Sequence, residues 1–162
     1  MPYQMQVDGI EEISETLSKL EERAPAIAAK GLYEGAGVMA DAMNTAAAGI
    51  KTAPFKWASM RRGETRLPSP EEKAIVQQAA AGIAKFNGSG AEIDTSIGFR
   101  NAGYAELKGK TVPIPKIVNA INSGTSFMRK QAFVRQAKRN GETKASEAMK
   151  TAIEAEFEAL TK

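Results

Sequence analysis

The sequence of 162 residues contains neither cysteine nor histidine. Without cysteine, the chain has no disulfide, no thiolate metal ligand, no iron–sulfur cluster and no thiol nucleophile. Without histidine, the Ser-His-Asp triad, imidazole general bases and nearly all zinc chemistry are excluded as well. An enzyme of this composition would depend on carboxylates, lysines, tyrosines and hydroxyls alone. These absences favour a binding or structural protein with no cofactor and no metal.

Long apolar runs are also missing. No stretch approaches the roughly 18 apolar residues of a membrane-spanning helix. The opening MPYQMQVDGIEEI lacks the basic start and apolar run of a signal peptide, so we expect synthesis in a cytoplasm and no membrane partner. Hydrophobic residues make up 43% and charged residues 25% of the chain, which is typical of a globular domain. We expect a single domain over residues 1–162.

The net charge of +3 hides a strong asymmetry along the chain. Residues 1–50 hold 3 basic and 8 acidic residues, whereas residues 51–66 hold 5 basic and 1 acidic. Residues 100–140 hold 9 basic and 1 acidic. A basic middle of this kind suits a phosphate backbone or an acidic surface on another protein. A solvated basic face without a partner is the third interpretation.

The first 50 residues predict two helices. Apolar residues recur at helical spacing from Ile10 to Leu20, and Ala24-Pro25 interrupts the run because proline disfavours helix at the residue before it. Pro25 itself suits the first position of a second helix, which we expect to reach about Ile50. That helix is rich in alanine and keeps three glycines, which indicates close approach of another backbone, within the chain or between subunits. The three are Gly31, Gly35 and Gly37.

Residues 51–68 show no clean period and contain prolines, a glycine and five basic residues, so we expect a basic loop or arm. Aromatic residues between the bases resemble a nucleic-acid-binding arm. The alternative is an ordered loop whose aromatic side chains anchor it to the core. The candidate contacts with nucleic acid or a partner protein are Lys51, Lys56, Trp57, Arg61, Arg62 and Arg66.

A helix start is expected at Ser69-Pro70-Glu71-Glu72, which combines a capping hydroxyl, a proline in the first turn and an acid at the third position. Apolar spacing extends this helix to Phe86. Alternation of apolar and polar residues then predicts a strand at 93–99. Turn signals delimit two further short strands, 104–107 and 111–114, which we assign to one antiparallel sheet.

The C-terminal part returns to helix. Pro115 opens a short helix over residues 116–121, and a final helix is expected at about 144–160, after a break at Asn140-Gly141. Residues 4–7 are a candidate first strand. Together these elements predict an α+β domain with long N-terminal helices, a small antiparallel β-sheet and a C-terminal helix packed on the sheet.

Two nucleotide-binding patterns occur, but neither has the required context. Residues 35–40 spell GxGxxA, a dinucleotide fingerprint that functions only after a buried strand, yet they lie inside a predicted helix. Gly109-Lys110-Thr111 resembles the end of a phosphate loop, but Tyr104 stands where that loop needs a glycine. The carboxylate pair Glu71 and Glu72 is expected on a solvated helix face. We therefore predict no catalytic residue.

The segment NSGTSFMRKQAFVRQA at residues 122–137 carries a resemblance to a known family. It is similar to a segment of the tailed-bacteriophage neck and minor-tail family, which reads Gly-Thr-Ser, a methionine, a short polar or proline stretch and then Phe-Leu-Arg-Pro-Ala. The order of predicted elements also looks like this family. Three positions depart from its pattern: Ser123, Phe127 and Gln136. The matching residues are Gly124, Thr125, Ser126, Met128, Ala132, Phe133, Arg135 and Ala137.

The resemblance implies a structural virion protein of a phage or prophage. Such a protein joins or completes the neck between head and tail by oligomeric assembly, for which we expect a ring. Its partners would be copies of itself, the connector, and tail-tube or tail-terminator proteins. It would be made in the host cytoplasm and reside in the virion neck or tail. An acidic N-terminal half and a basic C-terminal half suit the head-to-tail contacts of a ring.

The assembly surface is expected in the same segment. Its large apolar side chains either plug the domain's own sheet or face a neighbouring subunit, with cations beside them. The rival function is a small nucleic-acid-binding protein that uses residues 51–66 and 100–140 for non-specific contact with DNA. The predicted interface residues are Gly124, Thr125, Ser126, Phe127, Met128, Arg129, Phe133 and Arg135.

Overall fold

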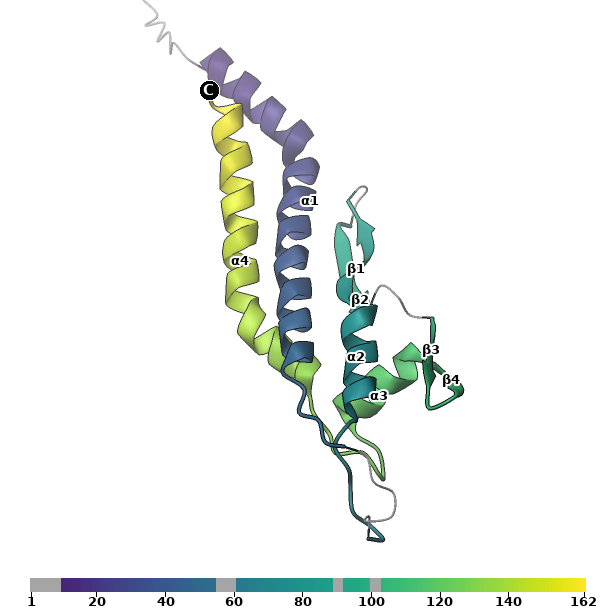
Figure 1. Ribbon diagram of the computed structural model, residues 1–162. Coiled ribbons are helices and arrows are strands. Elements are labelled where there is room, and N and C mark those ends of the chain that lie inside the picture. The colour runs from purple at the N-terminus through teal and green to yellow at the C-terminus, as the bar shows by residue number, and fades with distance from the viewer. Residues whose placement is uncertain (1–9, 55–60, 89–91, 100–102) are drawn as a thin grey trace, which may run out of the picture.

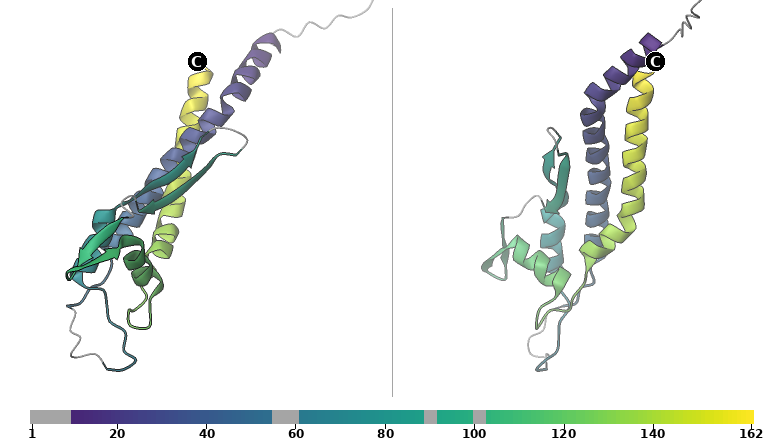
Figure 2. Two further views of the ribbon diagram at one scale, coloured as in Figure 1. Left: turned by 90° about the vertical axis from the view of Figure 1, so that its right-hand side faces the viewer. Right: turned by 180° about the vertical axis from the view of Figure 1, so that it is seen from behind.

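Two long helices form an antiparallel pair that gives the molecule its long axis (Figure 1). Helix α1 spans Ile10–Ala48 and helix α4 spans Phe133–Leu160. The other elements lie on one side of α1, mostly toward the end where α1 finishes and α4 begins (Figures 1 and 2). The structure, a computed structural model, describes residues 10–54, 61–88, 92–99 and 103–162.

Small residues on both helices let their backbones approach closely. A Cβ added at Gly31 would lie 2.8 Å from Cγ1 of Ile153, and one added at Gly141 would lie 2.8 Å from Cβ of Ala42. Both distances are well inside an ordinary carbon–carbon contact. The predicted close approach is therefore confirmed within the chain at Gly31, whereas nothing lies within 4 Å of a Cβ at Gly37.

Two predicted breaks do not occur. Helix α1 runs through Pro25, and helix α4 runs through Asn140-Gly141, so the separate helices on either side of Pro25 and the start at about residue 144 are wrong predictions. A proline inside a helix removes a hydrogen bond and costs about 3 kcal/mol, yet α1 continues through Pro25, which is exposed. The N-terminal part of α1, purple in Figure 1, leans relative to the rest of the helix.

Helix α2 spans Pro70–Ala79 and begins as predicted. The Oγ of Ser69 accepts a hydrogen bond from the N–H of Glu72 at 3.2 Å, and the Glu72 carboxylate accepts one from the N–H of Ser69 at 2.7 Å. This reciprocal pairing satisfies two free donors of the helix start. The predicted extension to Phe86 is wrong, because Ala80 adopts a positive φ of 48° and turns the chain into a strand.

Strands β1 (Ala81–Asn87) and β2 (Asp94–Phe99) form an antiparallel hairpin that lies along α1 (Figure 2). The side chain of Asn44 on α1 fixes the start of β1. It accepts from the N–H of the first strand residue at 2.7 Å and donates to the carbonyl of the same residue at 3.1 Å. Further along, the rings of Phe86 and Tyr33 pack edge to face with centroids 5.6 Å apart.

Strands β3 (Tyr104–Leu107) and β4 (Lys110–Pro113) form a second, separate hairpin. The three predicted strands at 93–99, 104–107 and 111–114 are present, but the single sheet is a wrong prediction, because β2 pairs with β1, which was expected as helix, and β3 pairs with β4. Lys108 and Gly109 have φ values of 52° and 74° and make the two-residue turn, which suits the twist of the flanking strands. Helix α3 follows at once over Ile114–Ser123, close to the predicted short helix.

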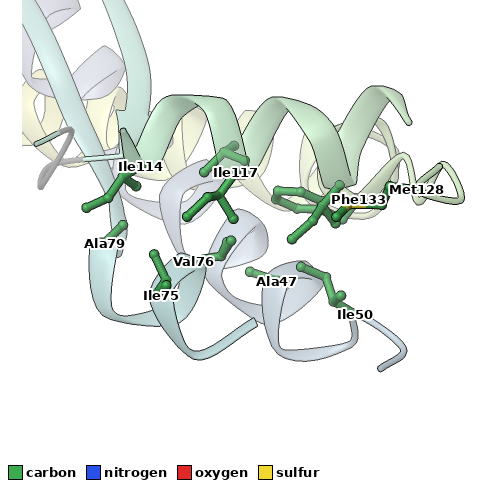
Figure 3. Packing of buried hydrophobic residues seen from close by; sticks show 11 residues of the cluster. Ala47, Ile50, Ile75, Val76, Ala79, Ile114, Ile117, Met128 and Phe133 are labelled. Atoms are coloured by element: carbon green, nitrogen blue, oxygen red, sulfur yellow. The ribbon is translucent and has the colours of Figure 1, made fainter. Parts of the chain in front are cut away.

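The hydrophobic core lies where the end of α1, helices α2 and α3, and the start of α4 meet (Figure 3). Ile121 and Val76 are fully buried there, and burial of each side chain contributes about 1.5–3 kcal/mol. The ring of Phe133, the first residue of α4, lies 6.2 Å from that of Phe99 and so connects α4 to β2. The buried members are Ala47, Ile50, Ile75, Val76, Ala79, Ile114, Ile117, Val118, Ile121, Met128 and Phe133.

Over the described residues, four helices and two small antiparallel sheets, with the longest helices first and last, confirm the α+β class. The described parts of residues 51–68 form a loop with one isolated bridge at Arg66. The predicted strand at 4–7 lies outside the described residues. Within those residues, no helix combines the length and the apolar character that crossing a membrane requires.

Candidate docking site

A tight turn at Gly124–Met128 leads from α3 toward α4. Gly124 ends α3 with a φ of 77°, a left-handed value that glycine adopts without strain. A Cβ at this position would also lie 3.1 Å from the backbone nitrogen of Lys130, so the chain passes too close for a side chain. Both conformation and space therefore require glycine here.

Thr125 closes the turn with its backbone and its side chain. Its N–H donates to the carbonyl oxygen of Met128 at 2.9 Å, and its Oγ1 accepts from the N–H of Met128 at 3.0 Å. Threonine hydroxyls commonly pair with nearby backbone in this way, which fixes the turn locally. Ser126 and Phe127 are exposed at the tip of the turn.

The end of the basic loop runs beside this turn as a short parallel bridge. The N–H of Arg66 donates to the carbonyl of Phe127 at 2.8 Å, and the carbonyl of Arg66 accepts from the N–H of Arg129 at 2.8 Å. The side-chain amide of Gln131 makes a second link through two 2.8 Å hydrogen bonds with the backbone of Lys51. The predicted basic loop and the predicted assembly segment therefore form one surface region.

Arg66, a predicted contact for nucleic acid or a partner, is held in a buried ion pair. Its two terminal nitrogens donate to both carboxylate oxygens of Glu72 at 2.6 Å, and the two side chains are 15% and 8% exposed. Burial raises the pKa of the Glu72 carboxyl, but hydrogen bonds from Arg66 and from the N–H of Ser69 outweigh it and leave that pKa below its usual value. The prediction that Glu72 lies on a solvated face is wrong.

Met128 and Phe133 point inward (Figure 3). Each is 3% exposed, and of the two alternatives for the large apolar residues, these two fill the chain's own core. In this conformation they support the turn from beneath and are not available to a partner. Phe127, by contrast, is 49% exposed, and Arg129 and Arg135 are exposed as well. The outward surface of the predicted interface is therefore the tip of the turn and these cations.

An open groove of about 750 Å³ lies between α3, the β3–β4 hairpin and this turn. Its walls are mainly apolar, with Leu107 and Val112 on the hairpin, Ile117 on α3 and Phe127 on the turn. Lys116 and the buried ion pair also border it. Apolar concave surfaces with a few polar groups are typical of the sites at which proteins bind ligands or other proteins.

The groove was not predicted from the sequence. The apolar residues of the hairpin and of α3 were visible in the sequence, and the strands that carry them were expected. Their spacing along the chain, however, does not determine how far apart two elements pack. A partial signal was available, because an isolated two-stranded hairpin that carries several apolar residues cannot bury them all within itself.

Exposed cations gather at the same end of the molecule. Lys51, Arg61 and Arg62 of the basic loop are exposed, as a solvated or partner-binding arm requires. Lys56 and Trp57, the other predicted contacts in this loop, lie outside the described residues. The exposed cations of the neighbouring elements are Lys108, Lys110, Lys116, Arg129, Lys130, Arg135, Lys138 and Arg139.

The nucleotide-like patterns lie in contexts that give them no phosphate-binding geometry. Residues 35–40 lie in the interior of α1, and Gly109-Lys110-Thr111 lies at the β3–β4 turn, so neither stands between a strand and a helix start. Within the described ranges, no three acidic side chains come together as a metal site would require. The part of the molecule that carries the turn and the groove therefore presents apolar surface and positive charge.

No family model, no curated protein and no solved structure matches the chain. The geometry of the turn and the groove and the sequence of residues 122–137 are the features that point to a function.

Proposed function

We propose that the chain is a structural virion protein of a phage or prophage that joins or completes the neck between head and tail. The observation that carries the proposal is the double role of residues 122–137. Their sequence resembles the neck and minor-tail family, and they form a rigid exposed turn beside an apolar groove. An exposed aromatic such as Phe127 on rigid backbone is typical of an anchor in a protein–protein contact.

In this proposal the protein functions by burying surface, and no bond is made or broken. Its partners are further copies of the chain, assembled as a ring, and the connector and tail-tube or tail-terminator proteins on either side. Permanent interfaces bury about 2,000 Å² or more in total. The groove supplies one part of such an area, and the exposed basic loop and the faces of the long helices offer the rest.

Light scattering at high protein concentration tests the proposal, alone and with connector and tail-tube proteins from the same genome. We expect a defined oligomer or a stable complex, and we expect Phe127→Ser to weaken it at least tenfold, because the anchor of the turn is lost. Phe86→Ser is the matched control, since it removes a partly exposed aromatic on β1, away from the groove. A monomer at every concentration, with no capture by either partner, contradicts the proposal.

The cluster of exposed cations favours one alternative, a non-specific nucleic-acid-binding protein. If Lys51, Arg61 and Arg62 bind phosphates together with the cations of the neighbouring elements, DNA affinity should fall about a thousandfold or more between roughly 50 and 200 mM salt. The structural role predicts weak binding with a shallow salt dependence. A salt titration of DNA affinity therefore separates the two functions.

A further inference from the structure

The N-terminal part of α1 carries an apolar stripe that the rest of the described chain covers only in part. Leu17, Leu20, Ala24 and Ile27 follow one another at spacings of three and four residues, so they share one face of the helix. Ile27 is 5% exposed between α1 and α4, Leu20 is half-buried, and Leu17 is 60% exposed. The stripe therefore changes from buried to exposed toward the start of α1.

The register of α1 against α4 explains this change. Lys30 pairs with Glu156 across the two helices, and α4 ends four residues later at Leu160, which places that end opposite about Ala26 of α1. About 24 Å of α1 lies beyond this point, at 1.5 Å per residue. The two helices also diverge toward their free ends (Figure 2, left). We refer to residues 10–26 as the overhang.

The charge of the overhang restricts its partner. Residues 10–26 hold five acidic and two basic residues, and residues 147–160 at the same end of the molecule hold four acidic and one basic. A second copy of this acidic end would repel the first. The opposite end of the molecule carries the apolar groove, with Lys110 and Lys116 exposed at the hairpin and on α3. Apolar surface and opposite charge occur together there.

We propose that the overhang of one copy docks as an amphipathic helix into the groove of a second copy. Leu17 and Leu20 would enter between the β3–β4 hairpin, α3 and Phe127, in the manner of helix-in-groove recognition. Acids of the overhang such as Glu21 would then face the exposed lysines of the groove. The inference deepens the proposed function and depends on it, because it identifies the contact through which copies assemble.

The shape of the molecule makes this contact intermolecular. The overhang and the groove lie at opposite ends of the long axis (Figure 1), so the overhang of one copy does not reach its own groove. A patch that binds a different patch on the next copy gives a head-to-tail assembly, which closes into a ring when the rotation between copies permits.

The absence of cysteine makes a direct test possible. Ser14→Cys, three residues before Leu17 on α1, and Ser126→Cys at the tip of the turn are made as separate variants that keep Leu17 and Phe127. They are mixed at a concentration at which the chain self-associates, and oxidised. We expect a disulfide-linked dimer in the mixture and none from either variant alone, because each overhang meets a groove and never another overhang. Ser96→Cys, an exposed position on β2, replaces Ser14→Cys in the control mixture and should give no product with Ser126→Cys.

Charge reversal supplies a second arm that does not touch the apolar contact. Lys110→Glu with Lys116→Glu in the groove copy should lower the cross-linked yield about tenfold, and Glu21→Lys with Glu22→Lys in the overhang copy should restore it. Oligomers without the mixed cross-link, or a link between two Ser14→Cys chains, overturn this contact while the proposed function stands. A chain that stays monomeric, alone and with connector or tail proteins, overturns both.

Discussion

Glu72 connects three parts of the molecule through one carboxylate. It accepts hydrogen bonds from the N–H of Ser69 at the start of α2 and from both terminal nitrogens of Arg66. The backbone of Arg66 in turn holds Phe127 and Arg129. The buried ion pair therefore contributes to the position of the docking turn, although it lies outside the turn itself.

Replacing Glu72 tests this arrangement. Glu72→Gln should lower the free energy of unfolding by about 3 kcal/mol at pH 7, because the charge of Arg66 stays buried without its partner. The pKa of Glu72 is lower in the folded chain than in the unfolded one. The carboxylate therefore stabilises the fold above an unfolded pKa of about 4.3, and this contribution is lost as the pH falls through the folded value. Urea unfolding at pH 7 and at lower pH should show the two proteins converging in acid.

Glu71 provides the control for this measurement. It is the neighbouring acid in the first turn of α2 and is exposed. Glu71→Gln should change the free energy of unfolding by no more than about 0.5 kcal/mol. An equal loss in both variants would mean that helix-terminal charge, and not the ion pair with Arg66, accounts for the effect.

Thr125 tests the rigidity of the turn itself. Thr125→Ala removes the hydroxyl that accepts from the N–H of Met128 and should cost about 1 kcal/mol in urea unfolding. Thr125→Ser keeps the acceptor and should recover most of that loss. If serine is as destabilising as alanine, the methyl group and not the hydrogen bond is what the turn requires.

Among the elements, β1 shows how a strand can carry a helical pattern. A bulge between Ile83 and Lys85 shifts the pairing, so that Ile83 lies opposite Ile97 and Phe86 lies opposite Thr95. Residues 95 and 97 share one face of β2, which puts Ile83 and Phe86 on one face although they are three residues apart. A spacing of three residues is a helical signal, which is why the sequence predicts that α2 continues to Phe86.

Both predicted helix breaks failed. At Gly141 tertiary packing outweighs local preference, because this part of α4 packs against α1. Pro25 is exposed, and nothing in the described chain packs over it to explain why α1 continues. Gly141 is present for space, since Ala42 and Met39 of α1 lie directly over it. A single sequence does not distinguish a glycine that ends a helix from one that admits a neighbour.

Two glycine substitutions separate these roles. Gly141→Ala should lower the free energy of unfolding by about 1–2 kcal/mol, since the clash with Cβ of Ala42 exceeds the gain in helix propensity. Gly37→Ala has open space around the new Cβ and should raise the free energy of unfolding by about 1 kcal/mol. Thermal or urea unfolding measures both. Stabilisation by both variants would show that the helices are farther apart than described.

Part of the candidate site could be predicted from the sequence and part could not. The turn at Gly124 and Thr125 follows from local chemistry, because glycine and threonine fix backbone within a few residues. The inward direction of Met128 and Phe133 depends on contacts with α1, α2 and α3, which no local pattern encodes. The pairing of Arg66 with Glu72 was missed because only the folded loop brings the arginine to the helix start.

On the scale of the whole molecule, the charge differs between the two ends of the long axis. The end of the molecule at which α1 begins and α4 ends is acidic, and the end that carries the groove and the basic loop is positively charged. An elongated chain with opposite charges and complementary apolar surfaces at its two ends is suited to repeated head-to-tail contact. This polarity supports the structural role in the virion that we propose from residues 122–137.

The most direct test of that role is electron microscopy of particles from the phage or prophage that encodes the chain, with its gene disrupted. We expect heads and tails that are separate or incompletely joined, and rescue by the wild-type chain but not by Phe127→Asp. Complete, infectious particles formed without the chain would contradict the account.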